Sequence, residues 1–195
     1  MEADEFGGPA LVLGSVRGRR SFGVRADGHL TGVFHTQVWH PGENLARCRR
    51  DGGVVERRPD GRIVVRTSSS REIGTGHGLG GCTCGFYAYY QQDPYTAHRR
   101  LSGVVEGYGR VVLGTAGFRA EKARILALLL PAEPAFDVRG PGAPGQPVHL
   151  DDVEPVERRE ADVTRIRSTY RDVAFFARED DMLAAYPPTE RGPEV

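Results

Sequence analysis

The residues best suited to chemistry are gathered in one short stretch, HGLGGCTCGFYAYY, which covers residues 77–90. It holds His77 and two of the three cysteines, Cys82 and Cys84, while Cys48 lies upstream. Structural zinc sites use four thiolate or imidazole ligands around one tetrahedral ion. In an extended segment, side chains at i and i+2 lie on the same face, so both cysteines of the pair could reach one ion. The spacing therefore predicts a structural zinc site with four ligands: Cys48, His77, Cys82 and Cys84.

Other interpretations of these residues stay open at this point. The cysteines would also suit small buried hydrophobic positions, with His77 in a loop. An enzyme would need a reactive thiol or an open zinc position, and His40 with Cys48 would be a candidate pair. No nucleophile elbow, phosphate loop or metalloprotease helix accompanies that pair, so the sequence favours a non-catalytic protein. A disulfide between Cys82 and Cys84 is disfavoured because a bridge across one residue is strained.

The same residues carry a resemblance to a protein family. Cys48, His77 and the run CTCGFYA at 82–88 are followed by VVEGYGRVVLGTAGFRAEKA at 104–123, and later by TYRDVAFF and MLAAYPP. In this arrangement the chain resembles a group of bacterial, actinobacterial-type proteins of unassigned function that share a Cys…His…Cys-Xaa-Cys-Gly-(Phe or Ile)-Tyr-Ala pattern. The resemblance spans most of residues 38–188, brings no known activity with it and favours the zinc interpretation.

Turn and strand patterns define the elements that must position these residues. Residues 11–39 alternate apolar and polar side chains around Ala-Asp-Gly at 26–28, which predicts a β-hairpin. Residues 54–66 form two β-branched arms around Pro-Asp-Gly at 59–61, which predicts a second hairpin. Residues 103–130 predict a strand pair with a turn at 114–117, although FRAEKARILALLL would also suit a helix.

Helices are expected in few places. Asp93 followed by Pro94 predicts a short helix over PYTAHRRL that ends by Gly103. Apolar residues at helical spacing predict a helix in 162–170, and REDDMLAAYPP predicts a last helical turn. Between them, VAFF at 173–176 is typical of a short strand.

The predicted fold class is α+β, mainly β, with a hairpin-rich core, a structural zinc site and a small C-terminal α/β segment. The core domain is expected over 8–130, with a basic hairpin inserted at 49–71. Residues 131–157 are rich in proline and glycine and are expected to form a linker. A small helix–strand–helix segment at 158–188 is expected to pack on the core.

Charge and composition limit the classes of partner. The chain has 26 basic and 26 acidic residues, so no strong overall field attracts nucleic acid or anionic lipid. It has no apolar run of about 18 residues and no signal-peptide pattern, so we expect a cytoplasmic protein without a membrane partner. The densest basic patch lies on the inserted hairpin: Arg49, Arg50, Arg57, Arg58, Arg62 and Arg66. This patch is either a solvated charged face or an interaction surface.

These observations favour a zinc-stabilised recognition module that binds a protein or a small ligand. Nucleic-acid binding is the first alternative, because the basic hairpin and the aromatic run at 86–90 could contact phosphates and stack on bases. Core packing on a half-buried strand is the commoner cause of such an aromatic run. A metal- or thiol-dependent enzyme is the second alternative.

Overall fold

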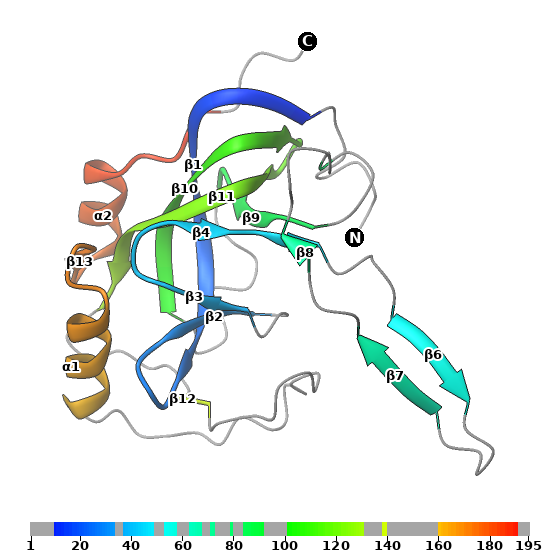
Figure 1. Cartoon of the computed structure of the whole chain (residues 1–195). Coiled ribbons are helices and arrows are strands. Elements are labelled where there is room, and N and C mark those ends of the chain that lie inside the picture. Colours follow the sequence, from blue (N-terminus) through cyan, green and yellow to red (C-terminus); the bar gives the residue numbers. More distant parts are fainter. Residues whose placement is uncertain are drawn as a thin grey trace.

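The computed structural model of the protein describes residues 10–33, 37–48, 53–57, 63–67, 71–72, 79, 84–91, 101–130, 138–139 and 160–190. Within these residues the chain forms 13 strands and two helices (Figure 1). Nine strands belong to one sheet, and two further sheets have two strands each. The predicted mainly β, hairpin-rich α+β class is therefore confirmed.

Three long antiparallel strands form the centre of the nine-stranded sheet. Strand β1 (Ala10–Arg25) pairs with β10 (Leu101–Leu113), and β10 pairs with β11 (Gly117–Leu129). The amide of Gly114 donates to the carbonyl of Gly117 at 2.8 Å and closes the turn that was predicted at this position. FRAEKARILALLL is a strand and its helical alternative is wrong, because β11 has strand partners along both edges, which satisfy its backbone groups.

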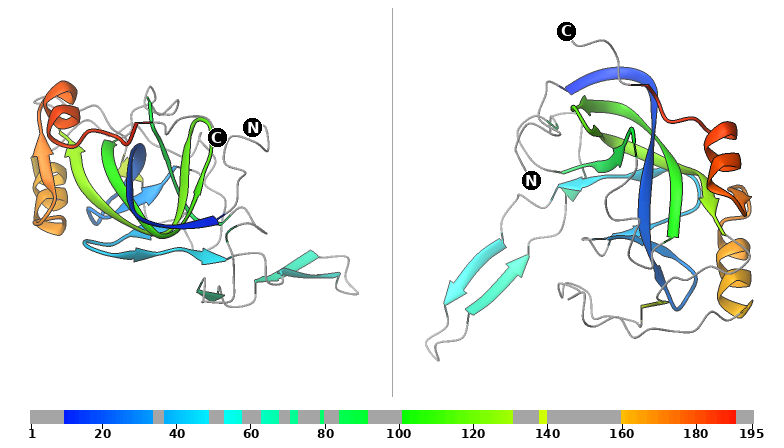
Figure 2. Two further views of the ribbon diagram at one scale, coloured as in Figure 1. Left: turned by 90° about the horizontal axis from the view of Figure 1, so that it is seen from above. Right: turned by 180° about the vertical axis from the view of Figure 1, so that it is seen from behind.

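Four strands of the nine-stranded sheet pair in a closed ring. Strand β9 (Phe86–Tyr89) pairs with β11 along its length, and its last residue pairs with Arg19 of β1. Because β1 and β11 also flank β10, the strands β1, β10, β11 and β9 form a ring, and Figure 2 shows how strongly the long strands curve. The helix expected over PYTAHRRL covers 94–101, of which 94–100 lie outside the described residues. A helical conformation at 101–103 is wrong, because β10 begins at Leu101.

Close packing between the four strands of this closed sheet depends on glycine residues. A Cβ atom on Gly117 would lie 2.0 Å from the carbonyl oxygen of Ala88, and one on Gly107 would lie 2.4 Å from the ring of Phe118. A Cβ atom on Gly18 would also lie 2.8 Å from that ring. The missing side chains therefore let the aromatic ring of Phe118 fill the interior without any exposure to solvent.

The first predicted hairpin is confirmed. Strand β2 (Leu30–Gly32) pairs with the end of β1 around the turn at 26–28, and Gly28 has a φ of +83°. Strand β3 (Val38–Trp39) extends the sheet from β2. Strand β12 (Val138–Arg139) pairs parallel with β1, so this part of the expected linker at 131–157 is a strand. The rest of that segment lies outside the described residues.

The C-terminal elements pack on the sheet at two places. Helix α1 (Glu160–Thr169) and the residue after it supply Ile166 and Tyr170 to the main core. Strand β13 (Ala174–Phe176) pairs with the end of β11, and helix α2 (Glu179–Ala185) places Met182 against Val104 and Ala127. The described part of the chain has no helix with the length and apolar content that a membrane span requires.

The second predicted hairpin is also confirmed. Strands β6 (Gly53–Arg57) and β7 (Ile63–Thr67) pair with each other in a sheet of their own. In Figures 1 and 2 their ribbons lie apart from the nine-stranded sheet. At the base of this hairpin, β5 (Arg47–Cys48) pairs with β8 (Arg71–Glu72).

Candidate metal centre

The path of the chain toward Cys48 is fixed by a short polar turn. The side-chain oxygen of Asn44 accepts a hydrogen bond from the amide of His40 at 2.7 Å, and its nitrogen donates to the carbonyl of His40 at 2.9 Å. Gly42 adopts a φ of +79° within this turn. The turn delivers Asn44 into β4 (Asn44–Leu45), which pairs with β11. The segment that leads to Cys48 is therefore extended, with β4 followed by β5 (Arg47–Cys48).

A polar cluster holds the entry of β4 against the sheet. The hydroxyl of Tyr108 donates to a carboxylate oxygen of Glu43 at 3.0 Å, and the ammonium of Lys122 lies 3.3 Å from the other oxygen. Partial burial and the hydrogen bond to Glu43 raise the pKa of Tyr108 to about 12. The same hydrogen bond and that of Lys122 lower the pKa of Glu43. Tyr108 therefore stays a neutral donor over the whole physiological pH range.

The segments that carry Cys48 and Cys84 meet on one edge of β11. The amide of Ala46, two residues before Cys48, donates to the carbonyl of Glu121 at 2.8 Å. Phe86, two residues after Cys84, pairs with the neighbouring residue Ala120. The ends of two segments that are far apart in the sequence are therefore neighbours in space.

Pairing at the base of the inserted hairpin brings a third segment to the same region. Cys48 pairs with Arg71, so the chain that leaves at Cys48 returns beside it after the hairpin. His77 follows six residues after Arg71 in the sequence. The insertion therefore does not separate Cys48 from the chain segment that leads to His77.

Three buried residues anchor these segments in one hydrophobic core. Ala46, Leu79 and Phe86 are 2%, 0% and 3% exposed, and all three belong to the main core cluster. Each predicted ligand lies two or three residues from one of these anchors, a backbone reach of at most about 10 Å. The core thus holds one anchor for every segment that contributes a predicted ligand.

Among the four predicted ligands, Cys84 is the one whose side chain the structure describes. It is half-buried, and it packs against the main core just before β9. The backbone of Cys48 lies in β5, whereas His77 and Cys82 lie outside the described residues. Within the part of the chain that is described, no group of three or more His, Cys, Asp or Glu side chains could hold a metal ion.

The backbone at Cys84 is held by Arg119 of β11. The guanidinium of this residue donates a hydrogen bond to the carbonyl of Cys84 at 3.1 Å, and the residue is only 5% exposed. Gly85 follows with a φ of +129°, and a Cβ atom there would lie 3.3 Å from the Cβ of Arg119. A buried arginine and a conformation suited to glycine therefore set the direction in which the chain enters β9.

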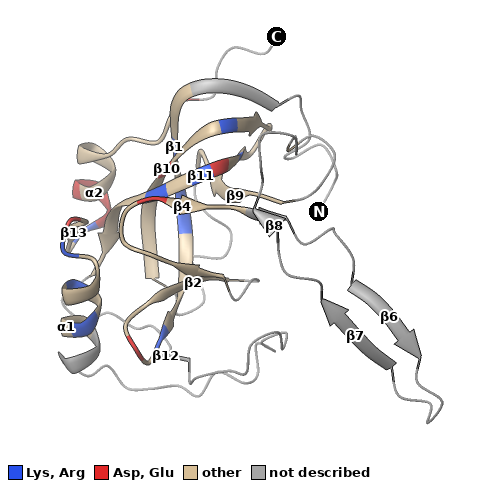
Figure 3. Cartoon of the chain, viewed as in Figure 1, with Lys and Arg blue, Asp and Glu red and all other residues tan. Residues whose placement is uncertain are grey.

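The surface of the nine-stranded sheet carries paired charges. Figure 3 shows basic and acidic residues beside one another on the central strands. Glu106 of β10 is buried, and its carboxylate lies 2.6 Å from the guanidinium of Arg124 and 3.9 Å from that of Arg17. Arg19 forms an ion pair with Glu179 at the start of α2. Each of these three arginines is therefore paired with a carboxylate, and Glu106 is shared by two of them.

The predicted basic surface lies on and around β6 and β7. Arg57 is the last residue of β6 and pairs with Ile63, and Arg66 of β7 pairs with Val54. The other arginines of this set lie outside the described residues: Arg49, Arg50, Arg58 and Arg62. The structure thus places two of the six arginines on the separate hairpin.

Sequence patterns missed two residues that matter at this site. Leu79 is the single apolar residue in the glycine-rich GHGLGG segment, and this contrast could have marked it as a core anchor. Arg119 gives no such signal, because an arginine in a strand is ordinarily a surface residue. Its role depends on the pairing of β9 with β11.

Comparison with known proteins identified no relative of this chain. No family model matches the chain, and no curated protein or solved structure is similar to it at a significant level.

Proposed function

We propose that the protein is a non-catalytic recognition module stabilised by one zinc ion. The proposed ligands are Cys48, His77, Cys82 and Cys84. Three thiolates and one imidazole fill a tetrahedral zinc shell, which leaves no open position for a substrate or an activated water. Such a site stabilises the fold and performs no reaction.

One observation carries this proposal. The segments of Cys48 and Cys84 converge at Ala120 and Glu121 of β11, and the pairing of Cys48 with Arg71 returns the chain to this point ahead of His77. Zinc ligands commonly come from segments that are distant in the sequence and adjacent in space. The donor types, together with the convergence of the Cys48 and Cys84 segments, therefore support a Cys₃His zinc site.

The proposed zinc ion would connect two parts of the molecule. A two-stranded hairpin is at best marginally stable by itself in water. Among the described residues, β6 and β7 are the two strands of their sheet. A metal at its base would fix the point from which the hairpin leaves the nine-stranded sheet. The hairpin, with the basic residues on and around it, would then be the part of the molecule that meets an acidic surface of a partner protein.

Metal analysis of the protein, purified without chelators, tests the zinc site. We expect about one zinc per chain. Cys84→Ser and His77→Ala should lose the metal and much of the thermal stability, because metal binding at such a site contributes folding free energy. His40→Ala is the matched control, since His40 is exposed, and it should keep both. Wild-type protein that holds no metal and melts normally would contradict the proposal.

Binding measurements test the recognition role separately. The probes are a fluorescent poly-glutamate peptide and a DNA duplex of matched charge, each titrated at several salt concentrations. We expect the acidic peptide to bind, and the triple variant of Arg57, Arg58 and Arg62 to serine to lose this binding. Preference for DNA with a steep salt dependence would favour a nucleic-acid reader instead. Binding of neither probe would contradict the acidic-partner proposal.

A further inference from the structure

We infer that Arg119 is a positioning residue for the zinc ligand Cys84 and compensates the negative charge of the site. This inference rests on the proposed zinc site and goes beyond it, because it assigns a role to a residue that is not a ligand. It follows from three properties of Arg119: its burial, its hydrogen bond and its place on β11.

Burial makes this arginine unusual. Arg119 is 5% exposed, and removing a guanidinium from water is unfavourable unless partners within the protein replace the lost hydration. Its charge therefore lies in an environment of low effective dielectric, where electrostatic interactions are strong. A site of Zn²⁺ with three thiolates carries one net negative charge, which a nearby guanidinium stabilises.

A hydrogen bond holds the charged guanidinium of Arg119 beside the segment that carries Cys84. One guanidinium nitrogen of Arg119 donates to the carbonyl of Cys84 at 3.1 Å. The next residue, Gly85, has a φ of +129°, so the backbone bends directly after the bonded carbonyl. Groups that hold the ligands of a metal in position are an established determinant of metal affinity. Arg119 thus fixes the peptide unit from which the thiol of Cys84 projects.

A second arginine provides an internal comparison. Arg20 of β1 also donates to a main-chain carbonyl, that of Tyr87 in β9, three residues after Cys84. Its guanidinium carbon lies 4.8 Å from the ring centre of Trp39, a cation–π geometry that accounts for its position. Arg20 therefore makes the same kind of hydrogen bond as Arg119, but at a carbonyl three residues after the proposed ligand.

The experiment compares Arg119→Met with Arg20→Met in the full-length protein. Zinc stoichiometry is measured by metal analysis, and zinc affinity by competition with a chromophoric chelator. We expect Arg119→Met to bind one zinc with an affinity about 10- to 100-fold weaker than the wild type, the range found for groups that orient metal ligands. Arg20→Met should keep the wild-type affinity. The absorption spectrum of the cobalt-substituted protein should shift in Arg119→Met alone.

If Arg119→Met does not fold, the zinc affinity of Arg119→Lys tests the inference instead. Lysine retains the charge but lacks the planar guanidinium, so its zinc affinity should lie below that of the wild type. Wild-type zinc affinity in either folded variant at position 119 would overturn the inference while leaving the zinc site intact. Equal weakening in Arg20→Met would also overturn it, since the effect would then be general to β9. Wild-type protein without zinc would instead refute the proposed function, and the inference with it.

Discussion

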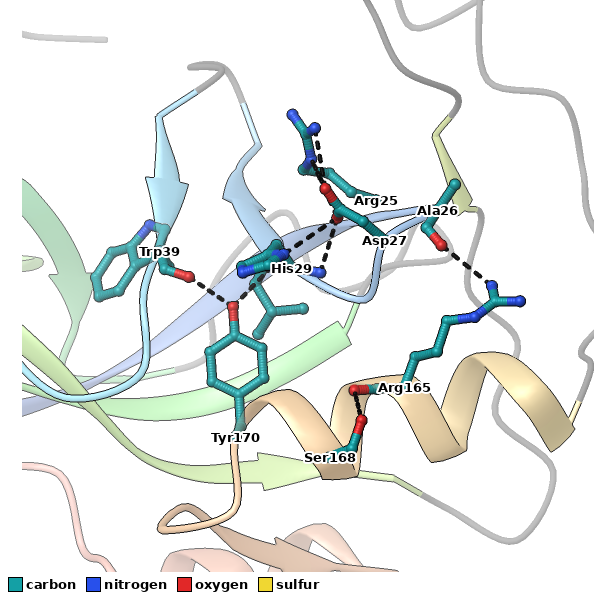
Figure 4. A network of polar contacts seen from close by, with 9 residues as sticks. Arg25, Ala26, Asp27, His29, Trp39, Arg165, Ser168 and Tyr170 are labelled. Atoms are coloured by element: carbon teal, nitrogen blue, oxygen red, sulfur yellow. Dashed lines mark hydrogen bonds and ion pairs between the residues drawn. The ribbon is translucent and has the colours of Figure 1, made fainter.

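The hydroxyl of Tyr170 donates a hydrogen bond to the main-chain carbonyl of Trp39 at 2.6 Å, and both residues are buried. The same hydroxyl accepts a hydrogen bond from the amide of Leu30 at 2.8 Å. Leu30 and Trp39 are cross-strand partners in β2 and β3, so one side chain satisfies the backbone of both strands (Figure 4). At the same edge, Arg165 of α1 donates to the carbonyl of Ala26 in the β1–β2 turn. Helix α1 is thereby attached to the first hairpin, β1–β2.

Tyr170→Phe should destabilise the protein by about 1–3 kcal/mol, because it leaves a buried amide and a buried carbonyl without their partner. Urea unfolding followed by circular dichroism measures this loss. Tyr108→Phe is the matched control, since the Tyr108 hydroxyl bonds to the exposed carboxylate of Glu43, and its loss should be clearly smaller. Equal losses in the two variants would show that the two buried hydrogen bonds of Tyr170 contribute no more to stability than the exposed one of Tyr108.

Stability should fall as the pH rises above 10. Burial raises the pKa of Tyr170 to about 12, the negative charge of Asp27 adds to the increase, and the hydrogen bond from Leu30 opposes it. An unfolded tyrosine loses its proton near pH 10, so between about pH 10 and 12 the folded state binds more protons than the unfolded state. The contribution is fully present below about pH 10 and decreases by up to roughly 1.4 kcal/mol per pH unit above it. Unfolding curves from pH 8 to 11.5 should show a shallower decline in Tyr170→Phe.

Gly117→Ala should be among the most harmful single-methyl changes in the sheet. Its new Cβ atom would lie 2.0 Å from the carbonyl oxygen of Ala88, so β9 and β11 would have to separate at a position where they pair. Overpacking of this kind costs about 1–3 kcal/mol or more. Gly14→Ala in β1 is the matched control, because nothing lies within 4 Å of its added atom. Thermal melts that are alike for the two variants would contradict the close packing of the ring.

Replacement of Arg57, Arg58 and Arg62 together by serine should leave the melting temperature nearly unchanged. The proposed role of these arginines is in binding a partner, and ion pairs on a protein surface contribute only about 0–1 kcal/mol to stability. The strands β6 and β7 also form a sheet of their own. Differential scanning fluorimetry measures the effect. Arg124→Ser is the comparison, and we expect it to be destabilising because Arg124 pairs at 2.6 Å with the buried carboxylate of Glu106. A large drop in the triple variant would show that these arginines are structural, and the hairpin would lose its proposed role.

The elements that local chemistry specifies were predictable from the sequence. Ala-Asp-Gly at 26–28 and Pro-Asp-Gly at 59–61 lie between strand arms, and both hairpins are present. Helical spacing located α1, and the VAFF pattern located β13. These signals depend on residues within a few positions of each other, because turn geometry and side-chain periodicity are short-range properties. They also identified the cysteine and histidine positions as candidate ligands.

Long-range pairing decided the rest. FRAEKARILALLL has a composition that suits a helix, yet it is a strand because β10 lies on one edge and β9, β4 and β13 lie along the other. The meeting of the Cys48 and Cys84 segments at Ala120 and Glu121 depends on this strand, as does the burial of Arg119 beside Cys84. The amino-acid sequence alone determined which residue types are available for the proposed zinc site. The tertiary structure decided which segments become neighbours, because strand pairing joins residues that no local pattern relates.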